Sequence, residues 1–163
     1  MIIRNIEELQ IFSRWLRDIL EKHCHCSKYL LKEDFRPVEI NFRRKIGGNE
    51  VDMIITCSIG DSSRVIKRTI GFELKESDTY KAVDQAIKRR NDFTWFYVVL
   101  DISVEKILSL LRNKPIMRAL EYGIGFVSGK DDVVVISSYM KQNIHYSASY
   151  MNLFDFLGGE NAT

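Results

Sequence analysis

A change in hydrophobic period part-way along the chain is the feature that most limits its possible folds. Between residues 38 and 75, three segments alternate apolar and polar residues, and glycine-containing turns at 47–49 and 60–63 separate them. A period of two is typical of strands with one buried face, and short turns between such strands produce an antiparallel meander. The period becomes helical over 80–92, and a continuous apolar run over 93–101 then predicts a strand buried on both faces.

This order of segments predicts a mixed sheet, because a helix that connects the third strand to the fourth makes those two strands parallel. Further segments surround this core: helical patterns at 4–22, 103–113, 115–122 and 149–159, and short strands at 123–128 and 133–138. We therefore expect one α/β domain over residues 1–163. It has a central mixed sheet, an antiparallel meander plus a parallel strand after a helical crossover, flanked by helices.

Composition is that of a globular chain with a sizeable core. Of 163 residues, 45% are hydrophobic and 28% are charged. No apolar run approaches the roughly 20 residues that cross a bilayer, and the N-terminal segment lacks the features of a signal peptide. We expect a cytoplasmic protein with no membrane partner. The three cysteines imply no disulfide framework, and Cys57, in an apolar strand, is expected in the core.

The net charge of +2 gives no global signal for nucleic acid, but the basic residues are clustered. Short blocks lie at 43–45, 67–68 and 88–90. Such blocks can form a local positive patch on a nearly neutral protein, or each can be a solvated face.

Two strands of the meander carry carboxylates on one face. Asp52 lies near the start of the second strand, and the third strand ends in Glu73 and Lys75 within "GFELK". Antiparallel pairing brings these ends together, so we expect the three side chains to share a face. Two carboxylates a few ångströms apart repel unless a cation lies between them, and such ligands suit Mg²⁺ or Mn²⁺. A strand with one solvated face would give the same residues without that role.

Further ligands are available near this pair. The backbone carbonyl of Leu74 can be a third ligand, and Glu50, on the same face as Asp52, can be an accessory ligand. Lys75 would stand beside a water bound to the ion. It could orient that water, stabilise the hydroxide, or hold the scissile phosphate. Metal and ammonium together suit phosphodiester hydrolysis.

These residues resemble the PD-(D/E)XK nuclease superfamily, the group with the restriction-endonuclease-like fold. The matching residues are Asp52 in "NEVDMII", Glu73 and Lys75 in "GFELK", and Gln85 in "AVDQAIKRR". The order of elements is also similar, and the resemblance covers roughly residues 5–128. It implies that Asp52 and Glu73 bind the metal, that Lys75 serves catalysis and that Gln85 supports the site. Some members have a further ligand on the first helix, which here would be Glu8 or Glu7. The alternative for Glu8 is an acid in the first turn of a helix, where it faces the helix dipole.

The chain departs from the family pattern at Val51, where the motif has a proline that members can lack. Gly71, on the same face as Glu73, is expected to leave room for the following helix or for a phosphate. The expected contacts to a nucleic-acid backbone come from the helix and the first strand: Lys81, Lys88, Arg89, Arg43 and Arg44.

The resemblance implies a Mg²⁺-dependent DNA endonuclease, acting on DNA of particular structure or without specificity. Its size is similar to that of the archaeal Holliday-junction resolvases, which act as homodimers with one site for each strand. Repair, viral and restriction nucleases are equally compatible. Two other functions stay open: a nucleic-acid-binding or structural module that keeps the fold without cleaving, and a small-molecule metal hydrolase.

The stretch "KHCHCSKY" offers a competing metal site at His23, Cys24, His25 and Cys26. Four consecutive residues do not converge easily on one tetrahedral zinc ion, and no second pair follows. We expect instead the frayed end of the first helix, where histidine suits the negative end of the dipole.

Overall fold

The computed structural model describes residues 13–24, 38–46, 48–60, 65–76 and 78–140. Glu8 and the predicted helix at 149–159 lie outside these residues. The helices are α2 (Arg14–Cys24), α3 (Thr79–Arg89), α4 (Val104–Leu110) and α5 (Lys114–Glu121), with a 3₁₀ turn, η2 (Arg90–Asp92). The strands are β1 (Val38–Ile46), β2 (Asn49–Gly60), β3 (Val65–Lys75), β4 (Trp95–Leu100), β5 (Ile124–Ser128) and β6 (Val133–Ile136).

The strands form one six-stranded mixed sheet in the order β1-β2-β3-β4-β5-β6. β1, β2 and β3 pair antiparallel, as the alternating pattern predicts. β4 pairs parallel with β3 and with β5, and β6 returns antiparallel at the far edge. The predicted meander and the parallel strand after a helical crossover are both confirmed.

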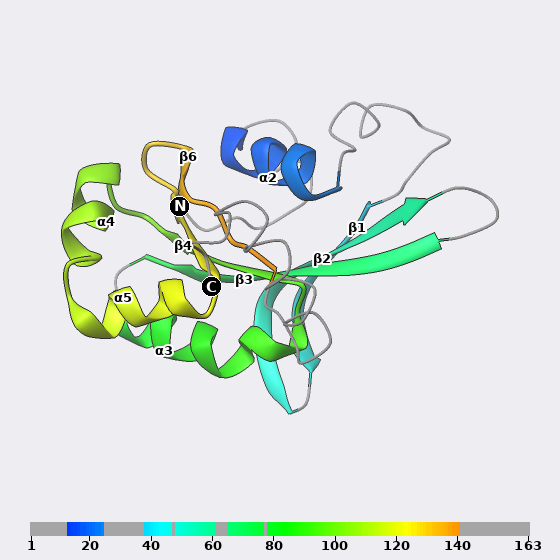
Figure 1. The fold of residues 1–163 in the computed structure, drawn as a ribbon, viewed down its shortest axis with the longest axis horizontal. Helices are drawn as coiled ribbons and strands as arrows, with labels where there is room; N and C mark the ends of the chain where they lie inside the picture. The colour runs from blue at the N-terminus through cyan, green and yellow to red at the C-terminus, as the bar shows by residue number, and fades with distance from the viewer. Residues whose placement is uncertain (1–12, 25–37, 47, 61–64, 77, 141–163) are drawn as a thin grey trace, which may run out of the picture.

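Helices cover both faces of the sheet, as Figure 1 shows. On one face α2 packs Trp15, Leu16 and Ile19 against buried residues of β2, β3 and β4. On the other face α3 and α5 enclose a second core, in which Ala82 and Ala86 are fully buried. Their small side chains let α3 lie close to the sheet, as expected. No helix in the described ranges is long and apolar enough to cross a membrane.

The β5–β6 turn caps one helix from each layer. The Asp132 carboxylate accepts hydrogen bonds from the backbone N–H groups of Arg14 (3.0 Å) and Trp15 (3.1 Å), at the start of α2. Its neighbour Asp131 accepts from the N–H of Val104 (2.8 Å), at the start of α4. The first N–H groups of a helix have no acceptor within that helix. Asp131 and Asp132 supply acceptors for such groups in α4 and α2.

The end of the crossover helix is held by Arg90, which is fully buried. Its guanidinium donates to backbone carbonyls: to Tyr122 and Tyr139 (both 2.7 Å), Phe93 (2.8 Å) and Thr94 (3.2 Å). Burial lowers the pKa of Arg90 to about 10. Although it belongs to a basic block in the sequence, Arg90 joins the end of α3 to the segment before β4, the end of α5 and the segment after β6, and it offers no surface charge.

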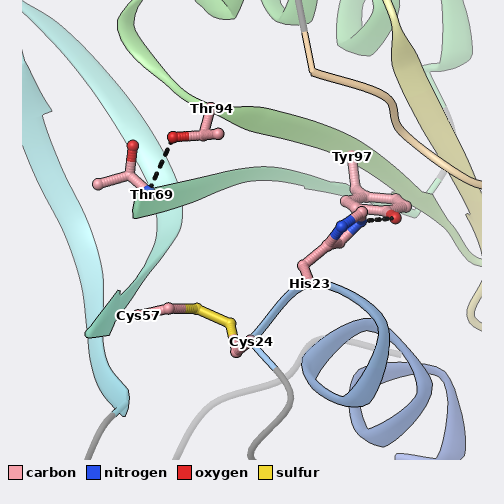
Figure 2. Close-up of a disulfide and its surroundings, with 6 residues drawn as sticks. All are labelled: His23, Cys24, Cys57, Thr69, Thr94 and Tyr97. Carbon is pink, nitrogen blue, oxygen red and sulfur yellow. Dashed lines mark hydrogen bonds between the residues drawn. A yellow bond between two sulfur atoms is a disulfide. The ribbon is translucent and has the colours of Figure 1, made fainter. Parts of the chain in front are cut away.

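The C-terminal end of α2 is packed, and the expectation of a frayed end is wrong for His23 and Cys24. His23 stacks on Trp95 with ring centroids 4.2 Å apart, and its Nε2 lies 2.6 Å from the Tyr97 hydroxyl. Cys24 and Cys57 form a disulfide, which the sequence did not imply (Figure 2). Cys57 is buried in the core as predicted. His25 and Cys26 lie outside the described residues.

Candidate active site

Asp52 and Glu73 meet where β2 begins and β3 ends. The β2–β3 register pairs Met53 with Phe72, and the next step along both strands brings Asp52 to Glu73. The two carboxyl groups lie close enough for the charge of Asp52 to raise the pKa of Glu73. Asp52 Oδ2 also accepts a 2.8 Å hydrogen bond from the backbone N–H of Leu74. The predicted approach of the two acids is therefore confirmed.

The Glu73 side chain is buried and carries a raised pKa. Only 2% of the residue is exposed. Burial, followed by the charge of Asp52, raises the pKa of Glu73 to about 8, whereas Arg89 and Lys75 oppose the shift. Burial deprives the ionised form of Glu73 of solvation and Asp52 repels it, so a further cation would find favourable electrostatics here.

Arg89 is the cation in contact with Glu73. One of its terminal nitrogens, Nη1, lies 2.8 Å from Glu73 Oε1, and only 12% of the Arg89 side chain is exposed. The sequence suggested that Arg89 would contact a DNA backbone, but in the structure its guanidinium lies within the acidic site. Its position four residues after Gln85 indicated a shared helix face, although nothing local identified Glu73 as the partner.

Gln85 lies one helical turn before Arg89 and presents a polar atom that lacks a partner. Among the described residues, Gln85 Oε1 and Arg89 Nε are buried side-chain atoms without a hydrogen bond. A buried acceptor without a donor costs roughly 1–3 kcal/mol, so such atoms usually mark the position of a water, an ion or a ligand.

This donor set fits a hard divalent ion. Mg²⁺ binds one or two carboxylates and keeps several waters, and those waters are donors that a buried amide oxygen can accept. Asp52 and Glu73 supply the carboxylates. Within the described residues no cluster of three or more His, Cys, Asp or Glu side chains could hold a metal, so a site here would be completed by the Leu74 carbonyl and water. Such a sparse set suits Mg²⁺ or Mn²⁺ better than zinc.

Lys75 and Leu74 end β3 with opposite orientations. Leu74 packs its side chain against the core beneath α2, while Glu73 faces the α3 layer. Strand alternation puts Lys75 on the same side as Glu73, and Lys75 is partly exposed. Its backbone carbonyl accepts from the N–H of Asp101 (3.2 Å), which fixes the end of β3 beside the end of β4.

The remaining predicted DNA-contact residues are exposed. Lys81 lies in the first turn of α3, and Lys88, near its end, forms a 2.9 Å ion pair with Asp84. Arg43 and Arg44 extend from β1, where Arg43 adopts a positive φ of 51°. These side chains are open to a polyanion, and the Arg44 guanidinium donates to Asn41 Oδ1 (3.1 Å).

Of the candidate accessory ligands, the structure describes only Glu50. Glu50 is exposed on β2 opposite Lys45 of β1, two residues before Asp52. Glu8 and Glu7 lie outside the described residues.

Gly71 has a role that the sequence pattern did not identify. A Cβ atom there would lie 2.6 Å from the ring of Phe96 and 3.0 Å from that of Phe93. The missing side chain therefore makes room for an aromatic ring of the core and not for a phosphate or for α3. A glycine within a strand often signals such an approach, but the parallel register Gly71–Phe96 was needed to identify the neighbour.

Comparison with known proteins gives no further guidance. No protein-family model, curated protein or solved structure matches the chain.

Proposed function

We propose that the protein is a Mg²⁺-dependent DNA endonuclease with a restriction-endonuclease-like fold. One observation carries the proposal: Asp52 and Glu73 interact at the end of β3, where Lys75, two residues after Glu73, shares their face. The strand order from β1 to β4, two antiparallel pairings followed by a parallel one, supports it because it is the order expected from the resemblance. Gln85 on the crossover helix adds a buried acceptor beside Arg89.

The metal would be held by the carboxylates of Asp52 and Glu73 and the carbonyl of Leu74. When bound, Mg²⁺ or Mn²⁺ polarises a phosphoryl oxygen and makes a water more acidic. Glu73 is buried and Asp52 is fixed by the Leu74 N–H, so these ligands need little rearrangement on binding.

Lys75 and Gln85 act on the other reactants. The Lys75 ammonium donates to the attacking water or to the scissile phosphate and offsets negative charge as it increases. The Gln85 amide oxygen accepts a hydrogen bond from water and restricts its orientation. In the reaction the water oxygen bonds to phosphorus, the bond from phosphorus to the leaving sugar oxygen breaks, and a proton from water is transferred to that oxygen through solvent.

The exposed cations supply contacts to the phosphate backbone. Lys81, Lys88, Arg43 and Arg44 bind charge and carry no base information, so recognition would depend on DNA structure or be non-specific. A homodimer would present two such sites, one for each strand of a duplex.

The proposal is tested with plasmid, linear, single-stranded and four-way-junction DNA, each incubated with Mg²⁺, Mn²⁺ or EDTA. We expect cleavage that requires the metal and falls more than about 100-fold in Glu73→Gln and in Lys75→Ala. Matched controls are Glu21→Gln, an exposed acid on α2, and Lys106→Ala, an exposed lysine on α4 outside the basic blocks. Both controls should cut at the wild-type rate.

The other two functions give different results in the same experiment. A non-cleaving module would bind at least one of these DNAs and cut none of them with either metal. A small-molecule hydrolase would cleave a simple phosphodiester such as bis(p-nitrophenyl) phosphate and neither bind nor cut DNA. Either result would overturn the nuclease proposal.

A further inference from the structure

We propose that Arg89 is an exchangeable counter-ion: it neutralises Glu73 in the metal-free protein, and it binds a DNA phosphate once a metal takes its place. The inference rests on the proposed function and adds a residue, and a step of charge exchange, that the motif does not contain.

The ion pair is shielded from solvent. Arg89 Nη1 lies 2.8 Å from Glu73 Oε1, and the two side chains are 12% and 3% exposed. An exposed pair of this kind contributes little, but a shielded pair is strongly coupled, so a second cation at Glu73 must compete with the guanidinium. Arg89 therefore holds a position that a metal bound to Glu73 would need or would strongly perturb.

Three consecutive basic residues at the end of α3 have three different environments. Lys88 is exposed and pairs with Asp84 on its own helix. Arg90 is buried, and its Nε, Nη1 and Nη2 atoms all donate to backbone carbonyls. Arg89 lies between them, and it is the member of this run that contacts a site carboxylate.

The comparison with Arg90 shows what is unusual about Arg89. A buried arginine that serves only structure is expected to have its donors satisfied, as Arg90 does. Arg89 instead has a buried Nε without a hydrogen-bond partner. Its pairing with Glu73 leaves donor capacity unused, whereas a planar guanidinium can bind a phosphate through two parallel hydrogen bonds.

These observations imply an exchange of charge. Without metal, once Glu73 is ionised above its pKa of about 8, the two carboxylates are opposed by Arg89 and Lys75. A divalent ion on Asp52 and Glu73 supplies the charge that Arg89 supplied and repels the guanidinium. The released side chain, anchored one turn from Gln85, can then donate to the phosphate that the metal attracts. No covalent bond is made or broken in this step.

The first test measures metal affinity without DNA. Mn²⁺ binding is followed by electron paramagnetic resonance above pH 8, where Glu73 is ionised, for the wild type, Arg89→Met, Glu73→Gln and the neighbouring control Lys88→Met. Loss of the competing cation should make Arg89→Met bind Mn²⁺ about fivefold more tightly or better. Lys88→Met should match the wild type. An unchanged or weaker affinity in a folded Arg89→Met protein would overturn the proposal.

The second test measures DNA binding with and without Ca²⁺, which is used to occupy the site without supporting cleavage. Arg89→Lys keeps the charge but lacks the planar fork, so it should bind DNA about fivefold more weakly than the wild type in Ca²⁺ and equally in EDTA. Equal weakening in both conditions would show an ordinary backbone contact and overturn the exchange.

A third measurement needs no variant at the acidic pair. The ¹⁵N–¹H signal of Arg89 Nε, assigned with Arg89→Lys, should shift when Mg²⁺ is added to the wild type, and the Arg90 signal should stay in place. If the Arg89 signal does not move although Mg²⁺ binds, the exchange does not occur.

The Mn²⁺ measurements distinguish failure of the proposed metal site from failure of the Arg89 proposal. If Glu73→Gln binds Mn²⁺ as tightly as the wild type, the metal site itself is wrong and both proposals fall. If Glu73→Gln loses Mn²⁺ while Arg89→Met behaves as the wild type, the metal site stands and only the role of Arg89 is overturned.

Discussion

The Asp52 carboxylate accepts a 2.8 Å hydrogen bond from the backbone N–H of Leu74, 22 positions further along the chain. This bond joins the start of β2 to the end of β3 through a side chain, next to Glu73. It holds the Asp52 carboxylate beside Glu73 despite their repulsion. Asp52 therefore combines a structural contact with its proposed role as a ligand, and the two can be separated by substitution.

Substitution of Asp52 should distinguish these roles. Asp52→Asn keeps an oxygen for the Leu74 N–H and removes a charge that repels Glu73, so we expect stability at pH 8 equal to the wild type or higher. Asp52→Ala leaves that N–H without its partner and should lower the free energy of unfolding by about 1 kcal/mol. Urea unfolding measures both. Each variant should lose Mn²⁺ binding, and wild-type affinity in Asp52→Asn would exclude this aspartate as a ligand.

The raised pKa of Glu73 predicts a pH dependence of stability in the absence of metal. The folded pKa is about 8 and the ordinary value is 4.5, so between these values the folded state holds more protons than the unfolded state. The contribution of Glu73 to the free energy of unfolding is therefore fully present below pH 4.5, and it is lost as the pH rises through about 8. In EDTA, Glu73→Gln should remove this part of the slope between about pH 5 and 9. If the free energy of unfolding depends on pH in the same way in the wild type and in Glu73→Gln, the prediction is contradicted.

Metal addition should offset this loss. Mg²⁺ binds the ionised carboxylate, so its stabilisation of the wild type should be largest above about pH 8 and small at about pH 5. Thermal unfolding with Mg²⁺ and with EDTA at both pH values measures the effect. Glu73→Gln should show little response at either pH, and an equal response would place the stabilising ion elsewhere.

Gly71→Ala should destabilise the protein through the core and not through the metal site. The added Cβ would meet the Phe96 ring at 2.6 Å, and Phe96 is fully buried, so we expect a loss of about 1–3 kcal/mol. Gly129→Ala is the control because the nearest atom to its Cβ lies 3.4 Å away, and it should change stability little. Adding Phe96→Leu to Gly71→Ala should recover part of the loss. A Gly71→Ala protein as stable as the wild type would contradict this packing.

The cap at the start of α2 is tested at Asp132, whose φ is 55°. Asp132→Gly removes the carboxylate and tolerates the left-handed backbone, so it isolates the hydrogen bonds to Arg14 and Trp15. We expect a loss of about 0.5–2 kcal/mol by urea unfolding. Asp132→Asn keeps an acceptor and suits this backbone region, so it should retain most of the stability. If both variants unfold at the same urea concentration, the carboxylate does not stabilise the helix.

The strands and the crossover were predictable because their signals are local. Alternation in β2 and β3 sets which residues share a face, and the short turns set the antiparallel order. Given that order, the approach of Asp52 to Glu73 follows from counting along two strands. Ala82 and Ala86 likewise indicated the face on which α3 lies against the sheet.

Other features depend on partners that no local pattern identifies. The members of the basic run at 88–90 look alike in sequence, yet tertiary contacts put Arg89 on Glu73 and bury Arg90 among carbonyls. The Cys24–Cys57 disulfide joins a helix end to a strand, and His23 is buried against β4. Each of these pairings was decided by how α2 and α3 dock on the sheet.

The sequence by itself therefore determined the order of the first four strands, the parallel crossover and the two acids on one face, because hydrophobic period and turn chemistry act over a few residues. Only the tertiary structure decided the charge state and the partners of that face. The pKa of Glu73 depends on its desolvation and on the positions of Asp52, Arg89 and Lys75. The burial of a side chain and the distances between charged groups are set when folding brings distant residues together, so a local sequence pattern does not encode them.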